Sequence, residues 1–275
     1  MFTSRPRQRL MSISRVAYVY ALIVIGLIAG VFISAFSTVA HNIYEDVAFF
    51  IAPSAGRAFA DGERHFDAQE PGQYDIAQAE YFFQKAARLD PSFPYVHHEL
   101  ARIYFLRGDF GGAMTQIDVQ IAEHGTSTPN SYYVRGLIEG YMGDYADSAK
   151  DYEKFLRFDP HDWAAINDYS WVLLKAGRAK DAAAATAEGL NYFPDNPWLL
   201  NTSAIALYES GHAKEARARA QAAVAAGAQL TEREWLHAYP GNDPKIAAEG
   251  IAALRQAAAD NVHRIDTALA GSAVQ

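Results

Sequence analysis

The sequence predicts an all-α chain, in which a single N-terminal transmembrane helix precedes a solenoid of helical hairpins that ends in a C-terminal capping helix pair. Two observations support this fold class. Small residues and turn glycines recur with a period of about 34 residues, which is typical of a solenoid built from helix pairs. An uncharged, apolar run near the N-terminus has the length of a membrane-spanning helix. The recurring small residues are Ala79, Ala113, Ser148, Ala182 and Ala216, and the recurring glycines are Gly108, Gly143, Gly177 and Gly211.

Residues 1–15 form a basic head, and residues 16–40 are expected to anchor the chain in a membrane. The head carries four arginines and no acidic residue, whereas the next 25 residues carry no charge. As a helix this run is ~37 Å long, enough to cross a hydrocarbon core of about 30 Å. Because positive charge stays on the cytoplasmic side, the N-terminus is expected in the cytoplasm and the rest of the chain outside it. A cleaved signal peptide is the alternative, but its apolar region is usually only about 7–15 residues long.

Residues 41–59 are interpreted as a juxtamembrane stalk. They are rich in aromatic and apolar side chains, which are favoured near lipid headgroups. Packing of this segment against the first repeat is an equally good interpretation.

Residues 60–227 are expected to form the repeat array, with an irregular first unit and about four further repeats. Each period has two helix-like stretches, such as 96–106 and 112–123, separated by a glycine. The glycine supplies the positive φ that ends the first helix, and a proline stops the second. The first unit is expected to lack a regular first helix, because Gly62, Asp67 and the Pro71-Gly72 pair interrupt it.

Residues 228–275 lose the period and are expected to cap the array. Thr231 and Glu234 have the spacing of a capping box, and Asp243-Pro244 can open a last helix. A terminal repeat leaves an apolar flank that must be covered, so we assign this tail to capping.

Several motifs of the array resemble those of the tetratricopeptide repeat (TPR) family. They are Leu100-Ala101-x2-Tyr104, Gly108-Asp109-Phe110, Ala113-x3-Ile117 and Ala79-x3-Phe83-x2-Ala86-x4-Pro91. The resemblance implies a solenoid whose first helices line a concave, protein-binding face. Thr186 and Ala220 stand where the family prefers a large ring, so looser packing is expected in the fourth and fifth units.

Composition and motif spacing argue against several functions. The chain has a formal net charge of −8, and an acidic surface does not suit nucleic acid. It has no cysteine, which excludes disulfides, thiolate metal sites and lipid-modified cysteine. His97 and His98 lack the i, i+4 spacing of a zinc site, and no phosphate loop or nucleophile elbow occurs. We therefore expect no catalytic residue, no metal and no cofactor, and we interpret the acidic residues as solvated helix faces.

The implied concave face is aromatic and polar. Exposed rings can cover apolar side chains of an extended peptide, while asparagine amides hold its backbone. Packing of the same rings between helices is the alternative. A clamp for a C-terminal carboxylate is disfavoured, because only Arg102 and Lys175 supply positive charge on this face. The candidate peptide-binding residues are Tyr95, Arg102, Tyr133, Tyr141, Asn167, Trp171, Trp198, Asn201 and Tyr208.

These features favour a non-enzymatic, membrane-tethered scaffold or adaptor in a bacterial envelope complex, single-pass in the inner membrane, which binds a protein or peptide. One alternative is a structural homo-oligomer, for which Gly26-x3-Gly30 offers a weak transmembrane contact. Another is an auxiliary subunit of a membrane enzyme, a secretion machine or a pilus machine.

Overall fold

The computed structural model of the chain describes residues 53–70 and 72–272. The predicted head 1–15, the predicted anchor 16–40 and residues 41–52 of the predicted stalk lie outside the described residues. Within the described ranges, every regular element is a helix, and none of these helices has the length and apolar character needed to cross a membrane. The chain divides into Met1–Ser54 and Ala55–Gln275, and the second unit is described below by itself.

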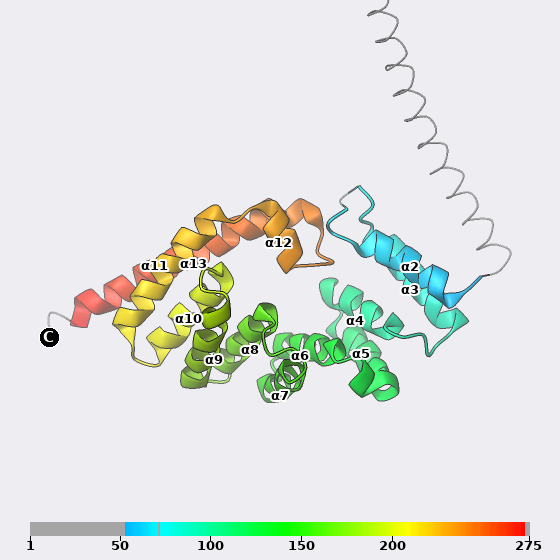
Figure 1. Ribbon diagram of the computed structural model, residues 1–275, viewed down its shortest axis with the longest axis horizontal. Coiled ribbons are helices and arrows are strands. Elements are labelled where there is room, and N and C mark those ends of the chain that lie inside the picture. Colours follow the sequence, from blue (N-terminus) through cyan, green and yellow to red (C-terminus); the bar gives the residue numbers. More distant parts are fainter. Residues whose placement is uncertain (1–52, 71, 273–275) are drawn as a thin grey trace, which may run out of the picture. The chain divides into compact units, whose positions relative to one another are not determined.

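Ten helices of this unit pair into five consecutive hairpins (Figure 1). The predicted all-helical hairpin solenoid is therefore confirmed. A short 3-10 turn, η1 (Gly125–Ser127), joins the second hairpin to the third. The hairpins are α2 (Ala55–Phe66) with α3 (Ile76–Leu89), α4 (Val96–Leu106) with α5 (Phe110–His124), α6 (Asn130–Met142) with α7 (Tyr145–Leu156), α8 (Trp163–Lys175) with α9 (Ala179–Tyr192), and α10 (Pro197–Glu209) with α11 (Ala213–Gln229).

The glycines between the helices of the last four hairpins have the predicted backbone conformation. Their φ angles are +76° at Gly108, +94° at Gly143, +73° at Gly177 and +91° at Gly211. A side chain at such a position would clash with the backbone, so glycine ends the first helix there at low cost. The recurring glycine is therefore the residue that sets the hairpin geometry.

The structure of the first hairpin differs from the prediction in two respects. The sequence predicts no regular first helix before Gly72, but α2 is a regular helix and ends at Phe66, before the turn residues begin. It also starts at Ala55, inside the range 41–59 predicted to be a stalk, so the array begins before residue 60. Gly62 does not break the helix, because it makes room for the Phe83 ring of α3. A Cβ atom there would lie 2.6 Å from that ring.

Small residues allow the helices to approach closely. Gly136 on α6 faces α7, where the Ser148 hydroxyl donates a hydrogen bond of 2.5 Å to the Gly136 carbonyl. Thr186 and Ala220, around which looser packing is predicted, are both fully buried, and the looser packing stays a prediction. The Thr186 hydroxyl is also satisfied, because it donates to the carbonyl of Ala182 at 2.9 Å.

The tail contains α12 (Glu232–Ala238), the 3-10 turn η2 (Pro244–Ile246) and α13 (Ala247–Ser272). The predicted capping box at Thr231 and Glu234 is present. The long helix α13 packs against α10 and α11, and Ile265 lies fully buried among alanines of these two helices. The flank of the last hairpin is thus covered. Helix α12 and the loop that follows it instead return toward the first hairpins (Figure 1).

Candidate functional site: an aromatic and acidic groove

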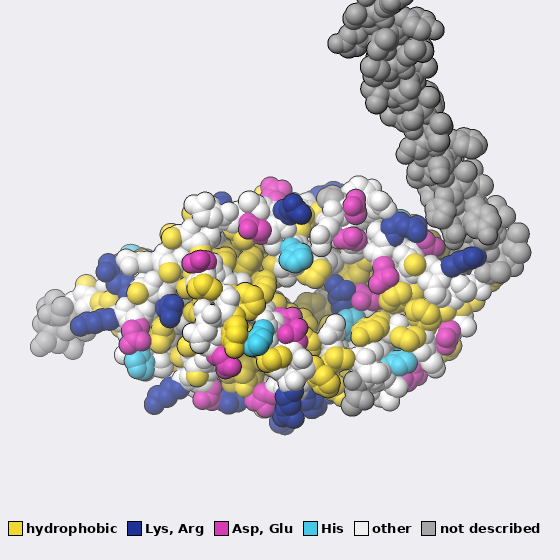
Figure 2. Space-filling model, viewed as in Figure 1, with side chains coloured by type: hydrophobic (Ala, Val, Ile, Leu, Met, Phe, Trp, Pro, Cys, Tyr) yellow, Lys and Arg dark blue, Asp and Glu magenta, His cyan; other side chains and the backbone are white. Residues whose placement is uncertain are grey.

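The first helices of all five hairpins, α2, α4, α6, α8 and α10, line a cavity of about 1090 Å³. Its opposite wall is residues 235–242, from α12 and the loop after it. We call the cavity the groove, and we call residues 231–243 the strap. Figure 2 shows the hollow on the face that it draws, edged by hydrophobic side chains with acidic and histidine side chains among them. The volume of the groove lies at the upper end of the roughly 300–1,000 Å³ of small-molecule pockets.

Seven of the nine candidate binding residues line the groove. They are Tyr95, Arg102, Tyr133, Tyr141, Asn167, Trp171 and Trp198. The other two face α13 instead. The Asn201 amide oxygen accepts a hydrogen bond of 2.9 Å from Asn261, and the Arg264 guanidinium lies 4.8 Å from the centre of the Tyr208 ring. Binding of a peptide by any of the nine stays a prediction.

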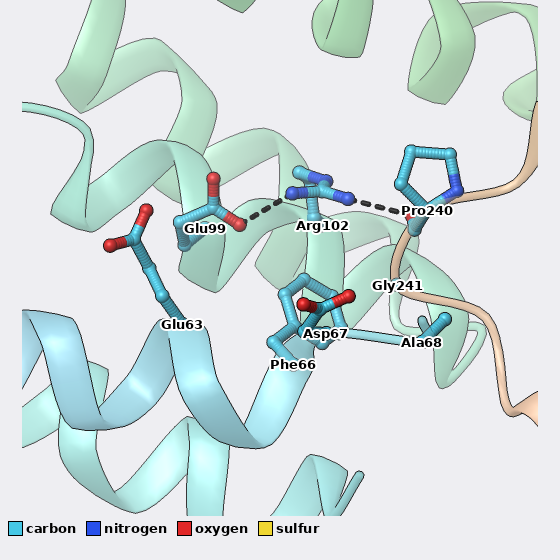
Figure 3. Close-up of a pocket in the computed structure, with 8 residues that line it drawn as sticks. All are labelled: Glu63, Phe66, Asp67, Ala68, Glu99, Arg102, Pro240 and Gly241. Atoms are coloured by element: carbon cyan, nitrogen blue, oxygen red, sulfur yellow. Dashed lines mark hydrogen bonds and ion pairs between the residues drawn. The ribbon is translucent and has the colours of Figure 1, made fainter. Parts of the chain in front are cut away.

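The strap is tied to the first two hairpins by hydrogen bonds between residues far apart in sequence. Arg102 on α4 donates to the Pro240 carbonyl at 2.7 Å and pairs with Glu99 at 2.7 Å (Figure 3). Its guanidinium also lies over the Phe66 ring, 4.8 Å from the ring centre. The Tyr74 hydroxyl donates to the Gly241 carbonyl at 2.7 Å. The chain therefore closes the groove on the side opposite α6 and α8.

Aromatic rings cover much of the groove wall. Trp163 and Trp198 stack with their centres 5.0 Å apart. Tyr239 of the strap lies 6.0 Å from Trp198 and 4.8 Å from Trp235, which is itself buried. Tyr141 is the most open of these rings, with 57% of its surface exposed. All four tryptophans of the chain line the groove, so their fluorescence reports on this site alone.

Asp168 on α8 is an acidic group of the groove that is held by neutral partners. Its two carboxylate oxygens accept hydrogen bonds from the Tyr133 hydroxyl at 2.8 Å and from the Asn167 amide at 3.2 Å. Within the described part of the chain, no Lys, Arg or His pairs with it. Burial raises the pKa of Asp168 to about 6, and the charge of Asp162 contributes to this shift. Asp168 is therefore a carboxylate whose charge lacks a counter-ion.

Acidic groups outnumber basic ones around the groove. Among the lining residues, Arg102 is the single Lys or Arg side chain. It pairs with Glu99, and no other lining carboxylate has a Lys or Arg nitrogen within 4 Å among the described residues. Burial, followed by the charge of Glu99, also raises the pKa of Glu63. The groove is therefore negative. Its carboxylates are Glu63, Glu99, Asp159, Asp162 and Asp168.

The two adjacent histidines of α4, His97 and His98, have structural partners. Burial lowers the pKa of His98 to about 4, so this ring is neutral at pH 7, and its Nδ1 lies 3.2 Å from the Ser131 hydroxyl. His97 contacts Gln116 and the Pro91 carbonyl at 2.7 and 3.1 Å. Across residues 53–70 and 72–272, no three His, Asp or Glu side chains gather as a metal site requires. The groove thus presents rings, amides and carboxylates.

The acidic groups and the strap were not predicted from the sequence. The acids were expected on solvated helix faces, although Asp168 follows Tyr133 by 35 residues, about one repeat, which is a spacing that brings neighbouring first helices together. That spacing is a signal that could have paired the two residues. The strap lies after the end of the period, and no local pattern indicates that it returns to Tyr74 and Arg102.

Comparisons with known proteins identify the fold. No family model and no curated protein matches the chain. Among solved structures, the crystal structure of MamA protein matches with a TM-score of 0.54 and 14% identity, over 64% of this chain and 96% of that one. The crystal structure of YrrB, described as a TPR protein with an unusual peptide-binding site, matches with a TM-score of 0.55 and 12% identity, over 75% of this chain and 97% of that one. At such low identity the likeness shows the fold alone, which is that of a TPR solenoid.

Proposed function

We propose that the chain is a non-enzymatic scaffold that captures an extended segment of a partner protein in the groove, while residues 16–40 tether it to a membrane. The observation that carries the proposal is the groove itself. It is a cavity of about 1090 Å³ lined by the first helices, with partly exposed rings and polar groups on its wall. An extended peptide presents alternating apolar and polar groups, which such a wall can cover and hydrogen-bond.

The setting at a membrane is supported by the N-terminal sequence. Four arginines precede a run of 25 uncharged residues, and the remaining chain is acidic. This order favours an inner-membrane protein with a cytoplasmic N-terminus and an extracytoplasmic repeat unit. A scaffold held there would gather components of an envelope complex. YrrB, which has a similar fold and is described as having an unusual peptide-binding site, supports peptide binding by a solenoid of this kind.

Recovery of partners from native membranes tests the capture. Tyr141→Ala removes the most exposed ring of the groove, and Tyr81→Ala removes a ring that is 50% exposed on α3, away from the groove. We expect crosslinked partners to be lost with Tyr141→Ala, because this ring lines the groove, and kept with Tyr81→Ala. Both variants replace a tyrosine by alanine, so they differ only in the position of the ring. Equal recovery with both variants, while both keep the helical spectrum of the wild type, would contradict capture in the groove.

Membrane extraction tests the tether. The full-length chain is expected to stay in the membrane pellet after alkaline carbonate treatment, and protease added to spheroplasts is expected to digest the repeat unit. A chain without residues 1–40 is expected in the soluble fraction. Release of the full-length chain by carbonate would refute the tether and leave the capture proposal intact.

A further inference from the structure

We propose that the groove selects a basic segment, in which a lysine or arginine side chain of an extended partner peptide lies beside Asp168. This inference rests on the proposed capture of a protein segment in the groove. It adds the chemistry of the segment, which the TPR fold does not determine.

The groove has more carboxylates than basic side chains to pair with them. Four of its five carboxylates lack a Lys or Arg partner among the described residues, and Arg102 is already engaged by Glu99 and by the strap. A carboxylate removed from water interacts more strongly with a nearby charge than an exposed one does. A basic peptide supplies the missing counter-charge, whereas an acidic peptide adds repulsion. The groove thus differs from a clamp for a carboxylate, which needs several free cations.

Tyrosine side chains share the groove with Asp168. The Tyr133 hydroxyl donates to its carboxylate from α6, on one side. Tyr239 of the strap lines the same groove as Asp168, and burial, followed by the charge of Asp168, raises the pKa of Tyr239 to about 12. Tyr141 of α6 also lines the groove, and burial, followed by the charge of Asp168, raises its pKa. Aromatic faces attract cations, so a Lys or Arg side chain would meet a carboxylate and rings together.

The carboxylate of Asp168 can accept further hydrogen bonds from a cation. Each of its oxygens accepts one hydrogen bond, from Tyr133 or from Asn167, and a carboxylate can accept about four. An added Lys or Arg would therefore donate to free lone pairs and displace neither partner. Bonds of this kind, between two ionised groups, are about twice as strong as neutral ones.

Intrinsic tryptophan fluorescence tests the proposal, since all four tryptophans line the groove. The full chain in detergent micelles is titrated with three synthetic nine-residue peptides that share the same flanking glycine, serine and proline residues. Their three central positions are all arginine in the first peptide, all glutamine in the second and all glutamate in the third. We expect the arginine peptide to bind at least about tenfold more tightly than the glutamine peptide, and the glutamate peptide to give no saturable change.

A matched pair of variants locates the cation. Asp168→Asn removes the charge and keeps an oxygen that can accept from Tyr133, while Asp195→Asn removes an exposed charge between α9 and α10. The arginine peptide is expected to bind about tenfold more weakly to Asp168→Asn and within about twofold of wild type to Asp195→Asn. Circular dichroism checks that both variants are folded.

The outcomes separate this inference from the proposed function. Equal binding of the arginine and glutamine peptides, or unchanged binding of the arginine peptide by Asp168→Asn, would overturn charge selection while capture of a segment still stands. Failure of every peptide to bind, together with failure to recover any partner from membranes, would overturn both.

Discussion

At the scale of single residues, the ionised carboxylate of Asp168 lowers the stability of the fold. Its carboxylate lies in the groove wall, held by Tyr133 and Asn167, and no described cation offsets its charge. Burial raises its pKa from the usual 3.8 to about 6. The unfolded chain therefore ionises this group at lower pH than the folded chain does. As pH rises from about 4 to about 6, the free energy of unfolding falls.

The change Asp168→Asn should therefore stabilise the protein at neutral pH. We expect a gain of about 1–2 kcal/mol at pH 7.5, after allowance for partial exposure, which is several degrees in melting temperature. At pH 4.5 the gain should be less than half as large, because the folded wild type is then largely protonated. Thermal unfolding at the two pH values measures it. A lower melting temperature of the variant at pH 7.5 would mean that hydrogen bonding to the charged carboxylate outweighs its burial.

The residues of the groove also show what can be predicted from the position of a residue within the repeat. Tyr133 and Trp171 reach the groove because equivalent positions of successive first helices share one face, and the period fixes that phase. Asn201 and Tyr208 have the same phase but meet α13, which no repeat-based argument places there. Asp168 was missed because periodicity does not reveal whether an acidic side chain on a helix meets solvent or a closed wall.

At the scale of elements, the strap is built around Gly241. Its φ angle of +92° suits glycine, and a Cβ atom would lie 2.9 Å from both the Arg102 guanidinium and the Phe66 ring. The sequence predicts the capping box that starts α12, since this signal is local. It does not predict the contacts of Tyr74 and Arg102 with the strap, which join residues 167 and 138 positions apart. Such contacts depend on the curvature that all the hairpins accumulate.

Substitution of Gly241 should open the strap, and Gly211 provides a matched control. Gly211 has a φ angle of +91°, and nothing lies within 4 Å of the position that a Cβ atom would take there. Alanine at either site should cost about 1–2 kcal/mol of backbone strain. Only Gly241→Ala also meets Arg102 and Phe66, so only this variant should show faster amide hydrogen exchange across residues 239–243. Equal exchange of the strap in the two variants would show that its contacts tolerate the collision.

At the scale of the whole described unit, α13 protects the C-terminal end of the solenoid. Ile265 is fully buried among Ala204, Ala216 and Ala220. In a solenoid each repeat is stabilised mainly by its neighbours, so the last hairpin depends on this cover. The period predicts where the array ends, and the apolar residues of the tail indicate a covering helix. The partner helices of α13 follow only from the structure.

A charge at Ile265 should loosen this end selectively. Ile265→Asp would bury an unpaired carboxylate and is expected to destabilise α10, α11 and α13 by more than about 3 kcal/mol. Ile246→Asp is the control, because Ile246 is 42% exposed and its change should cost less than about 0.5 kcal/mol. Urea unfolding followed by hydrogen exchange should show the last hairpin opening before α4 to α7 in Ile265→Asp. Uniform loss of protection along the array would contradict the expected neighbour-by-neighbour stability.

In the proposed capture, the contacts of the strap would determine how quickly a bound segment can leave. With Arg102 bonded to Pro240 and Tyr74 bonded to Gly241, a segment in the groove is encircled by one continuous chain. It can escape by sliding lengthwise or after these two bonds have broken. A partner with a folded domain on each side of the segment cannot slide, so its release waits for the strap to open. The residence time of such a partner is then set by the opening rate of the strap, and two partners of equal affinity can differ widely in how long they stay.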